Sequence, residues 1–353
     1  MDPTEISSTT KTDSPPKRLG LKLLLIFVLI LGFVTSFIAG FGMSSLIKQS
    51  VPSVAETPTP SIIPVVQKPP TLQAGNHYFD DTIILVTKDA PRVNLIASVT
   101  RKEQGDNFLE NTRVSYFNGS SWVREMNAQT ISDATIVGNA LIGKWNITFD
   151  PSRVLKQDVQ GTIQIKNNQL DFSTGTLQNE MVIRSLPGYT KFMSEGSGTI
   201  KINGEARSVY VLYTRIYSQN ADDIQTYSTS LGLTTHWVAF WDANGNFYHI
   251  DTTSVDKPTQ IYQTHQLAVA KDVDGRIAKV FQTIVHHDQQ SPPISYDISL
   301  PSPIGEQLNV SRVNGINKAP NGSYVWYMGN IEGTIDGREG KRTGIGLVEY
   351  IHD

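Results

Sequence analysis

Two histidines and an aspartate, His236, His249 and Asp251, lie within one short stretch of the chain, HWVAFWDANGNFYHID. A histidine titrates near neutral pH and can both give and take a proton, and a neighbouring carboxylate can stabilise its charged form. Asn244-Gly245 in the middle of the stretch tolerates the positive φ of a tight turn, and the flanking residues alternate in polarity. The stretch is therefore a candidate acid/base site on a β-hairpin.

The register of this hairpin decides whether the three side chains meet. A two-residue turn at Asn244-Gly245 places Trp241 opposite Tyr248 and gives the hairpin two distinct faces. One face is predicted to carry Trp237, Ala239, Trp241, Tyr248 and Ile250. The other is predicted to carry His236, Val238, Phe240, Phe247, His249 and Asp251. On this register the three polar residues converge as a catalytic set. The alternative is that they are ordinary side chains on a half-exposed strand, solvated or hydrogen-bonded to their neighbours. A slip of one residue would also separate them.

No motif for a cofactor or a metal ion accompanies the hairpin. The chain has no P-loop, no Gly-x-Gly-x-x-Gly after a predicted strand, no His-Glu-x-x-His and no Gly-x-Ser-x-Gly. His286 and His287 are adjacent in an extended segment, so they point to opposite sides and cannot easily share one ion. Cysteine is absent, which excludes thiolate catalysis and cysteine-ligated zinc. We therefore expect neither a cofactor nor a metal ion.

The charge of the chain argues against a nucleic-acid partner. The formal net charge of the 353 residues is −3, with no basic excess. Binding to phosphates would need a concentrated positive face. A protein partner cannot be inferred from the sequence.

The N-terminal region predicts a membrane anchor. Leu23 to Ile47 form an uncharged apolar run of about 25 residues, and a helix of about 20 residues crosses the hydrocarbon core. The basic residues that precede this run are Lys11, Lys17, Arg18 and Lys22, and only Lys48 follows closely. The positive-inside rule then keeps residues 1–22 in the cytoplasm and places the C-terminal part outside it. A cleaved signal peptide is the alternative, although its apolar core usually has only about 7–15 residues.

The rest of the chain predicts a stalk followed by strands. Residues 48–75 are rich in proline and form a stiff, extended linker. From residue 76 onward, short runs of Val, Ile and Thr are separated by Asn-Gly and similar turn pairs, and only residues 220–231 suggest a short helix. We therefore expect an all-β protein with a first β-domain over 76–218 and a second over 219–353.

The last part of the chain resembles a known family. YVWYMGNIEGTIDGREGKRTGIGLVEYI, residues 324–351, resembles the closing hairpin of carotenoid 1,2-hydratase (hydroxyneurosporene synthase) and AttH-type lipocalin-like proteins. The matching positions are Tyr324, Trp326, Glu332-Gly333, Asp336-Gly337, Gly344, Gly346 and Glu349. Residues 194–218 resemble the Gly-Thr hairpin of the same family. The resemblance implies two tandem lipocalin-like antiparallel β-barrels with an apolar cavity.

The chain departs from the family where the family has its acid. There a tryptophan is followed by an Asp-His or Asp-Arg pair, whose aspartate is a natural proton donor to an alkene. Here Tyr213 stands near that tryptophan and Arg215 near that aspartate. A guanidinium is never a proton donor at neutral pH, and no Asp, Glu or His lies between Ala206 and Gln219. The resemblance therefore predicts the fold without the hydratase chemistry.

Three functions remain open. The first is a membrane-anchored protein that binds a small apolar, lipid-like or isoprenoid-like ligand outside the cytoplasm. The residues predicted to line its site are Trp237, Trp241, Tyr248, Tyr324, Trp326, Tyr213 and Arg215. The second is an enzyme that acts on such a molecule by proton transfer, with His236, His249 and Asp251 as its catalytic residues. The third is a scaffold or adhesion module of the cell envelope, without a small ligand.

Overall fold

The computed structural model describes residues 77–131, 139–142, 145–148, 158–186, 188–224, 231–259, 261–318 and 324–353. The described residues form two sheets within one compact unit, Val66–Asp353. The predicted membrane segment and the proline-rich linker lie outside the described residues. Among the residues that are described, no helix is long and apolar enough to cross a membrane.

The first sheet is antiparallel and 11-stranded. Its strands are β1 (Tyr78–Thr87), β2 (Asn94–Gln104), β3 (Asn107–Phe117), β4 (Trp122–Ile131), β5 (Asn139–Ile142), β6 (Trp145–Thr148), β7 (Asp158–Ile165), β8 (Asn168–Thr176), β9 (Gln178–Leu186), β10 (Tyr189–Ile202) and β11 (Glu205–Ser218). Their order is β4-β3-β2-β1-β11-β10-β8-β7-β6-β5, and β9 pairs with β10 alone. The first strand of the chain therefore lies beside the last strand of this sheet, which brings β1 and β11 into register.

The second sheet is antiparallel and 9-stranded. Its strands are β12 (Leu233–Asp242), β13 (Phe247–Val255), β14 (His265–Lys271), β15 (Ile277–Val280), β16 (Ile284–His287), β17 (Ser295–Leu300), β18 (Glu306–Asn317), β19 (Val325–Gly337) and β20 (Gly340–His352). Their order is β15-β14-β13-β12-β20-β19-β18-β17-β16. The end strands β15 and β16 follow each other in the sequence, so this sheet curls back toward itself.

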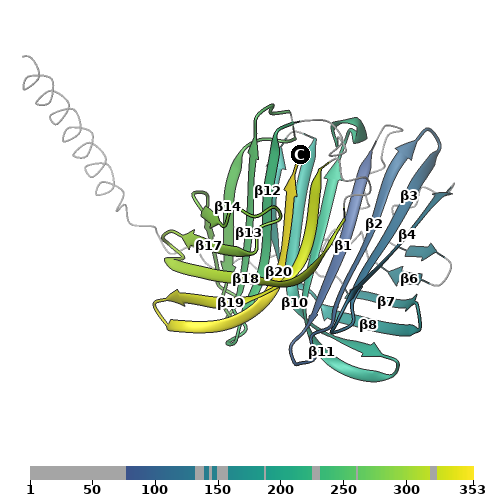
Figure 1. Cartoon of the computed structure of the whole chain (residues 1–353). Helices are drawn as coiled ribbons and strands as arrows, with labels where there is room; N and C mark the ends of the chain where they lie inside the picture. The colour runs from purple at the N-terminus through teal and green to yellow at the C-terminus, as the bar shows by residue number, and fades with distance from the viewer. Residues whose placement is uncertain are drawn as a thin grey trace, which may run out of the picture. The chain divides into compact units, whose positions relative to one another are not determined.

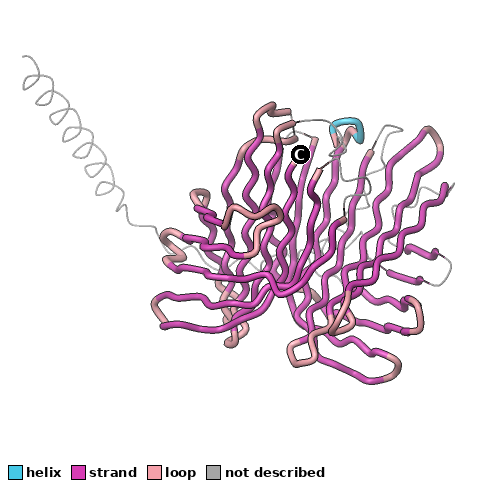
Figure 2. Tube along the Cα trace, in the orientation of Figure 1, coloured by secondary structure: helices cyan, strands magenta, loops and turns pink. Residues whose placement is uncertain are grey.

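Both sheets are strongly curved, as Figure 1 shows, and Figure 2 shows strands and loops almost throughout the described part of the chain. The all-β, barrel-like prediction is therefore confirmed. The expected short helix is a single 3₁₀ turn, Ala221–Asp223, and the side chain of Asn220 accepts a hydrogen bond from the Asp222 backbone N–H at 3.2 Å. Residues 225–230 lie outside the described part of the chain.

Alternation along the strands sorts the apolar side chains into two interiors and one interface. One cluster joins distant strands of the first sheet and fills its concave side, and another does the same in the second sheet. A third cluster combines both sheets. Strand β1 shows the sorting, because Ile83 and Leu85 point into the first interior while Ile84 and Val86 point toward the second sheet. The convex faces of the two sheets thus pack against each other.

The predicted register of the β12–β13 hairpin is wrong by one residue. Trp241 pairs with Phe247, not with Tyr248. The turn is a three-residue loop over 243–245, because Gly245 N–H donates to Asp242 O at 2.9 Å and Asp242 N–H donates to Asn246 O at 3.0 Å. Gly245 has φ +88°, which suits the left-handed position of such a loop. The Asp242 carboxylate stabilises this longer turn by accepting from the Asn246 backbone N–H at 2.9 Å.

The shift of one residue exchanges the faces of β13. His249 and Asp251 share a face with Trp237 and point toward the first sheet, whereas Tyr248 and Ile250 point into the second interior. His236 lies on the interior face of β12. The predicted convergence of the three polar residues is therefore wrong, for the reason that a slip of one residue turns a whole strand over.

The glycines of the closing strand provide a test of the β12–β20 pairing. A Cβ on Gly346 would lie 1.9 Å from the Ala239 carbonyl oxygen, so only glycine fits there. Gly346→Ala is expected to lower the free energy of unfolding by about 1–3 kcal/mol, because the clash forces the two strands apart. Chemical denaturation of the purified chain measures this loss, with the exposed Thr343→Ala on the same strand as control. Equal stability of Gly346→Ala and the wild type would contradict the close approach.

Candidate functional site

The residues predicted from the hairpin lie in two separate places. His236 is inside the second barrel, where its ring centroid lies 4.8 Å from His287, 5.8 Å from Tyr296 and 5.2 Å from Tyr350. Burial, together with the neighbouring His287 and His352, lowers the pKa of His236 to about 4, so this ring is neutral at physiological pH. His249 and Asp251 lie between the two sheets instead.

A group of buried and half-buried ionisable side chains, together with one tryptophan, lies between the sheets, beside the apolar interface. We call this group the interface polar cluster. It consists of Asp80, Arg113, Lys191, His249, Asp251, His265, Lys318, Trp326 and Glu349. Asp251, Trp237 and Glu349 are register partners across β13, β12 and β20. The two carboxylates therefore lie two strand spacings apart, about 10 Å, with the Trp237 indole between them.

Asp251 is ionised and tightly paired across the interface. Its carboxylate accepts from Lys191 Nζ of β10 at 2.6 Å and lies 3.1 Å from His265 Nε2 of β14. Burial alone would raise its pKa, but Lys191 and His265 hold the pKa of Asp251 well below its usual range. Burial also lowers the pKa of the neighbouring His249 to about 3. His249 is therefore a neutral ring that packs edge-on against Trp237, with centroids 5.4 Å apart.

Glu349 is the second ionised carboxylate of the cluster. It accepts from Lys318 Nζ at 3.0 Å and from the Trp326 indole N–H at 2.6 Å. Burial opposes ionisation, but these two donors lower the pKa of Glu349 below its ordinary value. The Lys318 ammonium also lies over the Trp326 ring, 4.4 Å from its centroid. Trp326 therefore contacts both the carboxylate and its counter-ion.

Asp80 is the carboxyl group of the cluster whose pKa is raised and not lowered. It accepts hydrogen bonds from Tyr78 Oη at 3.3 Å, Thr82 Oγ1 at 3.1 Å and Thr100 Oγ1 at 3.3 Å, but it forms no ion pair with any described residue. Burial raises the pKa of Asp80, and the attraction of Arg113 and the hydroxyl bonds only partly offset this effect. Asp80 therefore favours the protonated form more than the other two carboxyls do.

Arg113 is the cation on the same face as Asp80. It stands in register with Ser98 of β2, which pairs with Thr82 of β1. Its guanidinium carbon lies 5.9 Å from the Trp326 ring centroid, and its Nε finds no hydrogen-bond partner among the described residues. Asp80, Arg113 and Trp326 each remain partly accessible. A polar atom of a bound molecule would find both a donor and an acid here.

The cluster has the composition of an acid/base site. Three carboxyl groups share one desolvated region, and their surroundings push their pKa values in opposite directions, which is how acid and base roles are commonly separated. The indole faces of Trp237 and Trp326 can stabilise a developing positive charge. Met193, Leu212 and Met328 of the adjoining apolar cluster are buried and form the apolar core beside the polar groups. Among the described residues, no group of acidic and histidine side chains is arranged to hold a metal ion.

Sequence reasoning missed Asp80, Arg113, Lys191 and Lys318. Asp80 and Asp81 form an acidic doublet within an otherwise apolar strand, which is the one signal that could have been noticed. Alternation sends Asp80 to the interface and Asp81 into the first interior. The other three become neighbours only through the packing of the two sheets, and no local pattern marks them.

The remaining residues predicted to line a ligand site are distributed over several places. Tyr213 and Arg215 lie in the first interior, where both bind Asp81 at 2.5 Å and 2.6 Å. Asp81 is the register partner of Arg215, so β1 supplies the acidic residue that the β11 sequence lacks. Trp241 is fully buried in the interface and stacks on Tyr210 of the first sheet, with centroids 5.3 Å apart. Tyr324 is half-buried just before β19.

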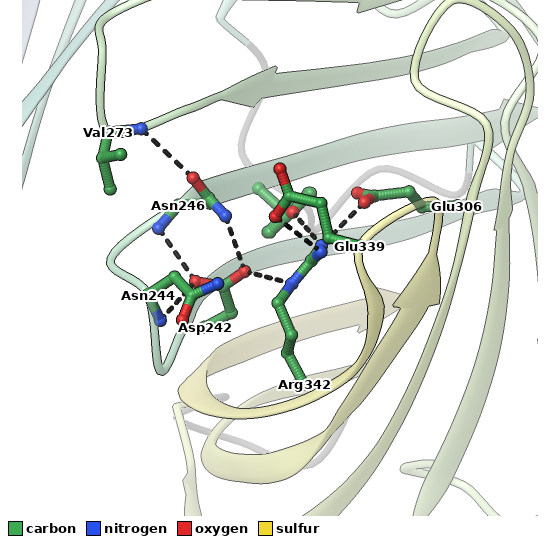
Figure 3. A network of polar contacts seen from close by, with 8 residues as sticks. Asp242, Asn244, Asn246, Val273, Glu306, Glu339 and Arg342 are labelled. Atoms are coloured by element: carbon green, nitrogen blue, oxygen red, sulfur yellow. Dashed lines mark hydrogen bonds and ion pairs between the residues drawn. The ribbon is translucent and has the colours of Figure 1, made fainter.

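Tyr248, the last of the predicted set, lies at the mouth of the second barrel. Its hydroxyl accepts from Arg342 at 2.9 Å. Arg342 also binds Asp242 at 2.8 Å and Glu306 at 2.7 Å, as Figure 3 shows. A pocket of about 200 Å³ adjoins these groups. The same Asp242 carboxylate accepts from the backbone of the hairpin turn, as Figure 3 shows, so this network fixes the hairpin.

Two solved structures share the architecture of this chain. A putative AttH protein from Nitrosomonas europaea has a TM-score of 0.54 and 13% identity, covering 78% of this chain and 92% of that chain. Kievitone hydratase from Nectria haematococca has a TM-score of 0.53 and 12% identity, covering 79% of this chain and 89% of that chain. No protein-family model matches the chain, and no curated protein matches it. The likeness confirms the two-barrel, lipocalin-like fold that the sequence resemblance implied.

Two matched substitutions test the electrostatics of the cluster. The raised pKa of Asp80 means that the folded protein loses stability as the pH rises from about 3.9, the unfolded value, through the folded pKa. Asp80→Asn cannot ionise, so it is expected to be more stable than the wild type at pH 7, with the difference vanishing below pH 4. Thermal or urea denaturation across pH 3–8 measures this change.

Asp251→Asn is expected to behave in the opposite way. The depressed pKa of Asp251 gives a stabilisation that is present above about pH 3.9 and is lost as the pH falls through the folded pKa. At pH 7 the substitution leaves Lys191 buried without its counter-ion, which costs about 3–5 kcal/mol. Destabilisation by Asp80→Asn, or a neutral effect of Asp251→Asn at pH 7, would contradict the assigned protonation states.

Proposed function

We propose that the protein binds a small, mainly apolar molecule between its two sheets and acts on it by proton transfer, with Asp80 as the acid. The observation that carries this proposal is the contrast between Asp80, whose pKa burial raises, and the paired carboxylates of Asp251 and Glu349. Among the described residues Asp80 accepts only from hydroxyl groups, whereas Asp251 and Glu349 each pair with a lysine. The binding surface would be the partly accessible indole of Trp326 together with Arg113 beside it.

The proposed reaction is the addition of water to a carbon–carbon double bond. The Asp80 carboxyl gives its proton to one carbon of the double bond, which leaves a positive charge on the other carbon. The indole faces and the nearby carboxylates stabilise this charge. A water molecule then bonds to the cationic carbon and releases a proton, which returns to the Asp80 carboxylate. The acid is regenerated, and the product is an alcohol.

The comparison with solved structures supports this class of reaction. Kievitone hydratase, whose name describes such an addition, shares the fold over most of both chains. The hairpin that matches the family's acid-bearing segment lacks an acid in this chain, but β1 pairs with it and places Asp81 opposite Arg215 and Asp80, on the other face, opposite Ile216. Because β1 supplies acidic residues next to β11, the absence of an acid from β11 is not by itself an argument against hydratase chemistry. The predicted triad of His236, His249 and Asp251 is not part of this proposal, because the register separates its members.

Binding without turnover is the second candidate. It is favoured by the pairing of Asp251 with Lys191 and of Glu349 with Lys318, which leaves two of the three carboxyls unable to exchange protons easily. The same surfaces would then hold an apolar molecule without changing it. Attachment to a membrane by residues 23–47, with both sheets outside the cytoplasm, remains part of either proposal.

A capture experiment followed by a turnover assay distinguishes an enzyme from a protein that binds its ligand without turnover. Native mass spectrometry of the full-length chain, purified gently from its source membranes, is expected to show a bound apolar compound. Returning the compound or its dehydrated form to the protein in oxygen-18 water is expected to exchange or add one oxygen. Asp80→Asn is expected to retain the compound while losing turnover by about 10²–10⁴-fold, the usual contribution of a general acid.

The matched control is Asp81→Asn on the same strand. Its side chain faces the first interior and binds Tyr213 and Arg215, so turnover per folded molecule should be retained. Loss of turnover in both variants, or in Asp81→Asn alone, would contradict the assignment of Asp80. Retention of the compound without exchange in the wild type would favour binding alone, and a protein that carries no compound but holds a stable protein partner would favour a scaffold.

A further inference from the structure

The exposed apolar side chains of the protein gather on one segment. Seven large apolar side chains are strongly exposed in the described part of the chain, and four of them fall within residues 273–284. These are Val273 at 64%, Ile277 at 44%, Phe281 at 70% and Ile284 at 50% exposure. Single exposed apolar residues are ordinary, but a local concentration of them marks an interaction surface. We call these four residues the seam patch.

The seam patch lies where the second sheet ends on both sides. β15 and β16 are the two end strands of that sheet, and Phe281 lies in the short connection between them. Lys279 Nζ of β15 donates to the Val182 carbonyl of β9 at 2.7 Å, so the patch adjoins the first sheet. Val182 is itself 44% exposed. Both sheets therefore carry exposed apolar side chains close to this contact.

The charges around the patch are balanced. Arg276 and Lys279 contribute positive charge, while Asp272 and Asp274 contribute negative charge. An oppositely charged partner would gain little from such a surface. The attraction that the patch offers is the removal of apolar side chains from water, which suits an apolar environment of no fixed shape.

The predicted membrane segment of the chain would bring the folded unit close to a lipid bilayer. Residues 23–47 have the length and composition of a membrane-spanning segment, and residues 48–75 connect it to the folded unit. At roughly 3.1 Å per residue a proline-rich segment of this length can reach up to roughly 90 Å, whereas a domain of this size has a radius of gyration of roughly 19 Å. The tether is thus long enough for any face to reach the bilayer. It also keeps the local concentration of that surface on the order of millimolar or higher.

We propose that the seam patch rests on the lipid bilayer, with Phe281 inserted among the lipid headgroups. The contact needs no tight pocket, because a tethered domain requires only weak additional affinity to stay on the surface. A second copy of the chain is the poorer occupant, since β15 and β16 are only four residues long and such short edges pair weakly. The proposal does not depend on the chemistry at Asp80, although it would let an apolar molecule pass from the bilayer to the protein without crossing water.

The absence of cysteine makes a direct test possible. Single substitutions Ile277→Cys, Phe281→Cys and Ile284→Cys can each be labelled with an environment-sensitive fluorophore in the full-length chain. Met126→Cys and Val313→Cys are matched controls, because these side chains are 58% and 55% exposed but lie elsewhere. Each labelled chain is reconstituted into nanodiscs of phosphatidylcholine and phosphatidylglycerol in equal parts, with and without a lipid that carries a doxyl quencher.

The labels at 277, 281 and 284 are expected to shift to shorter wavelength and to lose intensity with the quencher lipid, while the two control labels do neither. Emission and quenching at 281 equal to those at 126 and 313 would overturn the proposal. So would protection of the three labels that persists in detergent together with a doubled particle mass, because a second copy would then cover the patch. A chain that neither enters the nanodiscs nor floats with vesicles of the same lipids would also overturn it. None of these outcomes bears on turnover by the wild type. The membrane contact of the seam patch and the chemistry at Asp80 are therefore tested independently.

Discussion

The packing of two convex sheet faces against each other is the constraint on which the rest of the structure depends. A lipocalin-like barrel usually buries its concave side and leaves its outer face to water. Here the outer faces of β1, β10 and β11 meet those of β12, β13 and β20, so these strands are apolar on both sides. The interface is held by the stack of Tyr210 on Trp241 and by two buried ion pairs, Lys191–Asp251 and Lys271–Glu195.

The same packing creates the electrostatic contrast at the proposed site. Removing water from around a carboxyl group disfavours its charged form, and an adjacent ammonium reverses that effect. Asp251 and Glu349 each have such an ammonium, and Asp80 has hydroxyl donors and a more distant guanidinium. The different pKa directions of three chemically similar groups therefore follow from their neighbours, which are Lys191 of the other sheet for Asp251, Lys318 for Glu349, and hydroxyl groups with Arg113 for Asp80. The pKa of Asp80 is raised because the packing of the two sheets removes water from around its carboxyl group.

Most of the fold could be predicted from the sequence, because alternation, turn pairs and the closing-strand motif are local signals. The hairpin register could not, because Asp242 stabilises a three-residue loop where Asn244-Gly245 suggested two. The one extra residue in this loop determines which side chains of β13 face the first sheet, and it separates the three residues of the predicted triad. Trp237, Trp326, His249 and Asp251 lie in or beside one polar region, although the sequence had placed Trp237 on the face opposite His249 and Asp251. Their partners Asp80, Lys191 and Lys318 come from distant strands, which no local pattern could connect.

Titration of the Asp80 carboxyl tests the central claim most directly. Carbon-13 NMR of aspartate-labelled full-length protein, compared with Asp80→Asn to assign the signal, follows this one group as the pH changes. The account predicts that the carboxyl carbon of Asp80 keeps its protonated shift above the usual titration range of an aspartate, while that of Asp251 is already ionised at the lowest pH at which the protein remains folded. An Asp80 signal that titrates at or below about pH 3.9 would show that the space between the sheets is not a desolvated acid site.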